Sequence, residues 1–135
     1  MKTTNYFNTF IEVAEDCPVK EAEIPPYKGS EKTVANIHYE MIKDQPYKSS
    51  SDEVIFKAYA IKNKLREEEF EKEREKFFSK GQPCFRASPL PKRYGWGIHS
   101  NEEGKVALYA VESEEYQKLA QDKNLKHLKA MRSKR

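Results

Sequence analysis

Residues 96–111 read WGIHSNEEGKVALYAV, two short runs rich in apolar residues on either side of the polar segment Asn101–Gly104. Short strand-forming runs joined by a few turn residues that include glycine are typical of a β-hairpin. The sequence therefore predicts antiparallel strands over Trp96–Ser100 and Lys105–Val111, joined by a four-residue loop.

The length of this loop predicts which residues face each other across the hairpin. If Ser100 pairs with Lys105, then His99 lies on one face of the hairpin together with Val106 and Leu108. The single tryptophan then lies on the opposite face, because successive side chains of a strand point to opposite sides.

A further strand is expected near the N-terminus, over Tyr6–Ala14. Apolar and aromatic side chains fall on both of its faces, which predicts a strand that is covered on each side. Cys17 and Pro18 end this strand, and the proline-containing segment Ile24–Gly29 predicts an extended linker. Another short strand is expected over Cys84–Ala87.

Helical periodicity begins after the linker. Ser30 is expected to cap a helix over Glu31–Lys43, whose apolar residues recur at three- and four-residue intervals. A second helix is expected to begin near Ser50, which has the spacing of a capping box with Glu53.

Residues 66–80, REEEFEKEREKFFSK, are almost wholly charged. Interleaved positive and negative side chains allow i,i+4 ion pairs along a helix. The apolar residues of this segment are Phe70, Phe77 and Phe78. We therefore predict a solvated helix that touches the core through these phenylalanines and ends at Gly81, a residue type favoured just after a helix.

Ser113 is expected to cap a last helix, which Leu125 and Leu128 extend. Residues 122–135 are predicted to be a basic C-terminal tail or an extension of that helix. The element order predicts one α+β domain over residues 1–121. In it, a small antiparallel sheet, made of the N-terminal strand and the C-terminal hairpin, packs with three to four helices.

The composition is that of a folded, highly charged chain. Of its 135 residues 35% are charged, the net charge is only +3, and 8 Tyr, 7 Phe and 1 Trp are more aromatic side chains than a disordered chain carries. No apolar run approaches the roughly 18 residues of a membrane span, so no membrane partner is expected. Cys17 and Cys84 are far apart and form no disulfide framework, which predicts reduced thiols and a cytoplasmic protein.

The segment GQPCFRASPLPKRYGWGIHS, residues 81–100, combines cationic and aromatic side chains and has no acidic residue. Cations bind phosphates and aromatic rings stack on bases, so the segment predicts recognition of an anionic partner, nucleic acid or a phosphorylated ligand. Gly95 and Gly97 would let such a partner approach the backbone. The candidate ligand-binding residues are Arg86, Lys92, Arg93, Tyr94, Trp96 and His99.

Two other classes of function stay open. One is a small-molecule enzyme with a pocket at Cys84, Arg86 and His99, in which the cations lower the pKa of the thiol. The other is a protein-interaction module, which would show an exposed apolar patch or form a dimer. The oligomeric state is not predicted. No metal-ligand spacing, P-loop or dinucleotide fingerprint is present, so no cofactor and no metal are expected.

His38 lies within the apolar stripe of the first predicted helix. We interpret it as a core or boundary histidine whose ring nitrogens have hydrogen-bond partners, since buried polar groups are nearly always paired.

The strings TTNYFNTFIEVAEDCPV at residues 3–19, GQPCFRASPLPKRYGWGIHS at 81–100 and the following GKVALYAVESEEYQ resemble a family of small bacterial proteins known only as a domain of unknown function. The resemblance covers essentially the whole chain, and the RASPL and YGWG strings are its most specific parts. It implies a compact single-domain bacterial protein and carries no activity or site residues.

Overall fold

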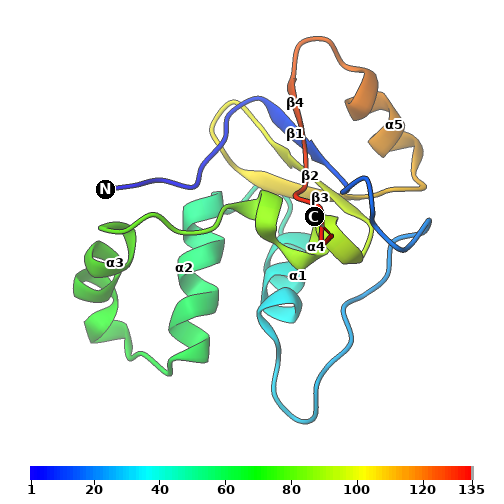
Figure 1. Ribbon diagram of the computed structural model, residues 1–135. Helices are drawn as coiled ribbons and strands as arrows, with labels where there is room; N and C mark the ends of the chain where they lie inside the picture. Colours follow the sequence, from blue (N-terminus) through cyan, green and yellow to red (C-terminus); the bar gives the residue numbers. More distant parts are fainter. Residues whose placement is uncertain (135) are drawn as a thin grey trace.

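The computed structural model describes residues 1–134, and Figure 1 shows a sheet with helices on both sides. Within these residues four strands form one sheet in the spatial order β3-β2-β1-β4. The strands are β1 (Thr9–Glu12), β2 (Trp96–Ser100), β3 (Val106–Ala110) and β4 (Lys126–Lys129). The α+β class is confirmed. The sheet is mixed, because β4 runs parallel to β1 while the other neighbours are antiparallel.

Helices α1 and α4 lie on one side of the sheet, α5 lies on the other, and α2 and α3 extend away from it beside α1 (Figure 1). The helical elements of the described residues are α1 (Val34–Asp44), α2 (Ser51–Lys62), η1 (Glu67–Glu69), α3 (Phe70–Phe78), η2 (Phe85–Ala87), α4 (Pro89–Arg93) and α5 (Glu114–Gln121).

The main core lies between the sheet and helices α1 and α4. Ile11 and Ile98 are paired neighbours on β1 and β2, and both pack with Ile42 of α1. On the other face of the sheet the ring of Phe10 meets Tyr116 of α5 edge to face, with 5.0 Å between centroids. The central strand β1 is therefore covered on both faces, as its two-sided apolar pattern predicts.

Side-chain caps define where the helices begin. Thr33, and not Ser30, caps α1, because Thr33 and Asn36 form a reciprocal capping box. The helix therefore starts three residues later than Glu31. The capping box of Ser50 and Glu53 at the start of α2 is confirmed.

The charged segment forms a second apolar cluster with α2. It contains the short turn η1 followed by α3, which ends at Phe78, before Gly81. The rings of Phe70, Phe77 and Phe78 all pack against Phe56 of α2. The three phenylalanines thus attach α3 to α2, and only Phe77 also touches the main core.

The hairpin register differs from the prediction by one residue. Ser100 pairs with Val106, not with Lys105. The side-chain oxygen of Asn101 accepts the backbone amide of Lys105, and Gly104 adopts a positive φ of 79°. This closes a loop with one more residue than the four predicted.

The C-terminal segment completes the sheet. For residues 122–135 the sequence predicts a basic tail or an extension of the last helix. That prediction is wrong at Lys126–Lys129, because α5 ends at Gln121 and these four residues form β4, which pairs with β1. The amide of Ala130 continues this pairing to the carbonyl of Glu12. The last residue of the predicted tail, Arg135, lies outside the described residues. Among the helices of residues 1–134, none combines the length and apolar character that a membrane span requires.

Candidate ligand-binding pocket

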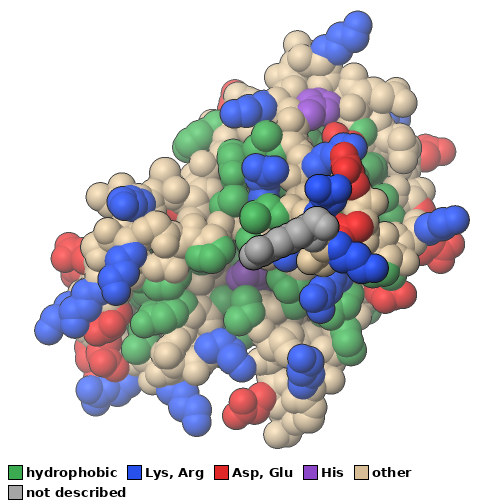
Figure 2. All heavy atoms as spheres, in the orientation of Figure 1, with side chains coloured by type: hydrophobic (Ala, Val, Ile, Leu, Met, Phe, Trp, Pro, Cys, Tyr) green, Lys and Arg blue, Asp and Glu red, His purple; other side chains and the backbone are tan. Residues whose placement is uncertain are grey.

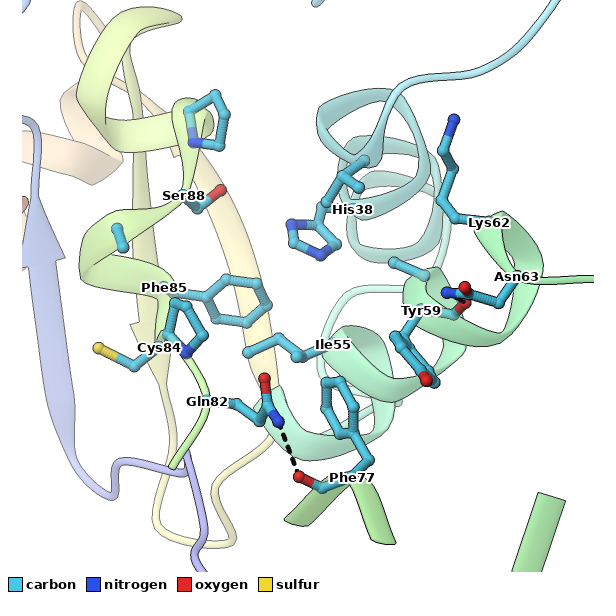
Figure 3. A pocket seen from close by; sticks show the side chains of 15 residues that line it. His38, Ile55, Tyr59, Lys62, Asn63, Phe77, Gln82, Cys84, Phe85 and Ser88 are labelled. Carbon is cyan, nitrogen blue, oxygen red and sulfur yellow. Dashed lines mark hydrogen bonds between the residues drawn. The ribbon is translucent and has the colours of Figure 1, made fainter. Parts of the chain in front are cut away.

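A pocket of about 360 Å³ opens between α1, α2 and the segment Gln82–Pro89 (Figure 3). Its walls are mostly apolar and aromatic, and include Ile55, Tyr59, Phe77 and Phe85. The rings of Tyr59 and Phe77 lie 4.6 Å apart between centroids and form one side. Ligand sites in proteins are typically clefts of this kind, apolar with a few polar groups.

The local sequence of Gln82–Pro89 explains how this wall of the pocket forms. Ser88 caps the short helix α4, its side chain accepting the amide of Leu90, and Pro89 occupies the first helical position. The backbone before it closes into the turn η2, with the amide of Ala87 donating to the carbonyl of Cys84. The strand predicted over Cys84–Ala87 is therefore wrong, because the Ser-Pro helix start favours a turn.

His38 carries the main polar group of the pocket. The residue is only 6% exposed, and Figure 3 shows its ring projecting from α1 toward Phe85. Burial lowers the pKa of His38 to about 4, so the imidazole is neutral at pH 7. Its Nδ1 atom is shielded from solvent and has no hydrogen-bond partner within the described residues. The prediction of a buried histidine is confirmed, but the prediction that its nitrogens are paired is wrong.

Ser88 and Gln82 are among the other polar side chains that line the pocket, with Tyr59, Lys62 and Asn63. The hydroxyl of Ser88 is buried and accepts the Leu90 amide at 3.2 Å, which leaves its proton for another acceptor. The amide nitrogen of Gln82 donates to the carbonyl of Phe77 at 2.7 Å and so fixes the lower end of the pocket in Figure 3.

The entrance combines apolar surface with positive charge. Val34 lines the pocket and is 42% exposed, and Lys62 at the rim donates to the carbonyl of Lys32 at 3.1 Å. Figure 2 shows hydrophobic side chains gathered on this face, with Lys and Arg side chains around them.

Cys84 contributes to the pocket wall, but its thiol points away from the cavity (Figure 3). The sulfur lies 3.2 Å from the hydroxyl of Tyr6. Burial and this hydrogen bond raise the pKa of Tyr6 to about 12, so Tyr6 is no general base for the thiol near neutral pH.

Arg86 has a structural contact at the edge of the sheet. Its Nε donates to the carbonyl of Lys129 on β4 at 2.8 Å, and its own carbonyl accepts the amide of Met131. These bonds connect η2 to the last strand.

Trp96 and Tyr94 do not form an exposed stacking surface. Trp96 is 7% exposed, and its ring nitrogen donates to the carbonyl of Glu23 at 2.8 Å. Tyr94 is half-buried against the main core. Lys92 and Arg93, in the last turn of α4, form no ion pair with any residue that the structure describes.

His99 lies on the other side of the molecule from this pocket's polar groups. It pairs with Ala107, not with Val106 as the predicted register requires. Its Nδ1 is 2.7 Å from the hydroxyl of Tyr47. That hydroxyl also contacts Tyr109 of β3 at 2.7 Å. His99 lies on β2 and Arg86 contacts β4, and β1 lies between these two strands, so the structure does not bring His99 together with Arg86.

The glycines of the YGWG string are approached by the protein itself. An added Cβ at Gly97 would lie 2.6 Å from Tyr116 and 2.7 Å from Phe10. Gly95 has a φ of 80° and packs against Ala22. These contacts account for both glycines without a ligand.

The pocket therefore contains few of the predicted site residues. None of the six candidate ligand-binding residues lines it; Cys84, a candidate of the alternative enzyme site, does, whereas His38 and Ser88 were not candidates. The sequence places His38, a titratable residue, inside an apolar stripe. That position predicts burial, but it does not reveal that Nδ1 is unpaired. Within residues 1–134, no group of three His, Cys, Asp or Glu side chains is arranged to hold a metal ion.

Fold and pocket define a small α+β protein with a mostly apolar cavity beside a buried neutral histidine. The chain belongs to a family described as a family of unknown function, DUF6157, which it matches over residues 1–135. The resemblance to a domain of unknown function is thereby confirmed. Neither the comparison with curated proteins nor that with solved structures found a match.

Proposed function

We propose that this protein binds a small, largely apolar organic molecule in the pocket between α1, α2 and Gln82–Pro89. The observation that carries the proposal is a mostly apolar cavity of about 360 Å³ with the buried, neutral imidazole of His38 at its lining. The proposal keeps the class of ligand, a small molecule, that the sequence left open as an alternative. The proposed site lies beside His38 and not at Cys84, Arg86 and His99.

The free-energy cost of burying an unpaired nitrogen of His38 favours a binding role for this residue. A buried polar atom without a partner destabilises the folded state by roughly 1–3 kcal/mol. A phenylalanine at this position would pack on Phe85 without that cost. A ligand in the pocket can give the imidazole a hydrogen bond at its other ring nitrogen, Nε2, which is not shielded as Nδ1 is.

The walls supply the apolar part of the binding energy. The half-buried rings of Tyr59 and Phe77 present aromatic surface to the cavity, and burial of apolar surface contributes roughly 25 cal/mol per Å². Planar aromatic compounds match such walls best, because stacked and edge-to-face ring contacts add to the area term.

Titration of the pure protein with 2-naphthol, followed by two-dimensional NMR of the backbone amides, tests the proposal. We expect the largest shift changes at residues of α1, α2 and Gln82–Pro89. Ala58 of α2 lines the pocket, so Ala58→Leu should fill the cavity and abolish binding. Ala120→Leu, a like change on α5, is the matched control and should bind normally. Absence of binding by 2-naphthol and by a panel of other aromatic compounds would contradict the proposal.

Recognition of an anionic partner is a second candidate function. It is favoured by Lys92 and Arg93, whose charges have no acidic partner within the described residues. Labelled single- and double-stranded oligonucleotides, titrated at two salt concentrations, test it. Binding should weaken with salt and with Arg93→Ala, since phosphate contacts release counterions. Affinity that does not change with salt would argue against it.

A further inference from the structure

We infer that the molecule bound in this pocket is an aromatic compound with a hydroxyl group, which donates a hydrogen bond to the imidazole of His38 and accepts one from the hydroxyl of Ser88. The inference rests on the proposed function and specifies the chemical class of the ligand. It follows from which polar groups the cavity offers and which charges it lacks.

His38 offers an acceptor. The ring is 6% exposed and neutral, so one ring nitrogen carries a proton and the other a lone pair. The edge-to-face contact with Phe85, 5.4 Å between centroids, holds the ring at the lining of the pocket. Nδ1 is shielded from solvent, so the nitrogen that a ligand hydroxyl can reach is Nε2, whose lone pair accepts a hydrogen bond when Nδ1 carries the proton.

Ser88 offers a donor on another side of the same cavity. Its oxygen accepts a hydrogen bond from the Leu90 amide, and its proton is free to point into the pocket. Figure 3 shows the hydroxyl of Ser88 on the side of the segment that faces His38. A hydroxyl group is both donor and acceptor, so one such group on a ligand can satisfy both residues.

The charges of the lining argue against an ionised ligand group inside the cavity. Among the lining residues that the structure describes, Lys62 alone carries a full charge at neutral pH. Its Nζ donates to the carbonyl of Lys32, and Figure 3 shows the side chain extending away from His38. Burying a carboxylate or ammonium group beside a neutral imidazole leaves that charge without a counterion, at a large cost.

The ring contacts select the body of the ligand. Tyr59 and Phe77 stand on one side and Phe85 on the other. Phe85 is almost fully buried, whereas Tyr59 and Phe77 are half-buried, so a flat aromatic ring can contact Tyr59 and Phe77 while its hydroxyl reaches toward His38 and Ser88.

The test compares 2-naphthol with 2-methylnaphthalene, which has the same shape but no hydroxyl, and with 2-naphthoate, which is ionised. The full chain should bind 2-naphthol about tenfold more tightly than 2-methylnaphthalene, the ratio that one hydrogen bond supplies. It should bind 2-naphthoate more weakly than 2-naphthol. In His38→Phe the preference for 2-naphthol should disappear while 2-methylnaphthalene still binds. His127→Phe, on β4, is the matched control and should keep the preference.

A second measurement on the unmodified protein covers the case in which His38→Phe does not fold. The ring nitrogens of ¹⁵N-labelled His38 should shift on addition of 2-naphthol and stay unchanged with 2-methylnaphthalene. Equal binding of the two compounds, or tighter binding of 2-naphthoate, would overturn the hydroxyl assignment and leave the proposed function standing. If none of the three compounds binds, the inference falls together with the proposed function.

Discussion

The imidazole of His38 meets the ring of Phe85 edge to face, with 5.4 Å between centroids and 86° between planes. Phe85 belongs to the main core and is 1% exposed, so the contact places a titratable ring at the boundary between that core and the pocket. An unpaired nitrogen and a lowered pKa both follow from this position.

Replacement of His38 by phenylalanine should reduce the sensitivity of the fold to acid. The pKa of His38 is about 4 in the folded protein, against 6.5 for an exposed histidine. Between these values the unfolded chain binds the proton and the folded chain does not, so stability falls as the pH falls below 6.5. From pH 7 to pH 5 the titration of His38 should lower the free energy of unfolding by about 2 kcal/mol.

Urea unfolding at pH 7 and pH 5 measures this difference. His38→Phe should lose about 2 kcal/mol less than the unmodified protein over this range. Burial also lowers the pKa of His99, so part of the acid sensitivity remains in the variant. An equal loss in both proteins would show that His38 does not resist protonation in the folded state.

Gly97→Ala should destabilise the protein by at least about 1–3 kcal/mol, the usual cost of overpacking. Its Cβ would lie 2.6 Å from a ring carbon of Tyr116 and 2.7 Å from one of Phe10, between α5 and the sheet. Thermal or urea unfolding measures the effect. Gly81→Ala is the control, because nothing lies within 4 Å of its added Cβ, and it should unfold like the unmodified protein or at slightly higher temperature.

Truncation after Asp122 should abolish cooperative folding, because it removes β4 and exposes the edge of β1. Truncation after Met131 keeps β4 and removes the hydrogen bonds of Ser133 and Lys134 to Asp16, so it should cost little. Circular dichroism during heating distinguishes the two. A chain ending at Asp122 that melts as sharply as the full protein would show that β4 is dispensable.

Asp52→Ala should cost roughly 3 kcal/mol, since it removes a buried carboxylate that accepts the buried amide and hydroxyl of Thr4. The carboxylate of Asp52 is 2% exposed and accepts the hydroxyl of Thr3 and the amide and hydroxyl of Thr4, each at 2.7 Å. Asp44→Ala changes an exposed carboxylate on α1 and should shift stability by less than about 0.5 kcal/mol. Urea unfolding at neutral pH compares them, and equal stabilities would show that Asp52 does not anchor the N-terminal segment.

Features set by neighbouring residues could be predicted from the sequence. The capping box of Ser50 and Glu53 and the cap of Ser113 both depend on residues within one helical turn, and both are confirmed. The α+β class follows from the order of such local elements. Where two local signals compete, as Ser30 and Thr33 do at the start of α1, the better-paired cap decides.

Features that depend on distant residues could not be predicted in the same way. The segment Lys126–Lys129 becomes a strand because β1 offers it an open edge, although the two are more than a hundred residues apart in the chain. The position of Trp96 likewise involves a carbonyl at Glu23, which is distant in the chain.

The candidate site belongs to this second group. Its polar residues, His38 and Ser88, come from α1 and from the start of α4, and neither is part of a sequence motif with a known spacing. The sequence shows that His38 lies on an apolar helix face and is therefore buried. Whether a buried imidazole has a partner depends on which side chains the folded chain brings within hydrogen-bond distance, and only the tertiary structure shows that Nδ1 has none and that a cavity lies beside it.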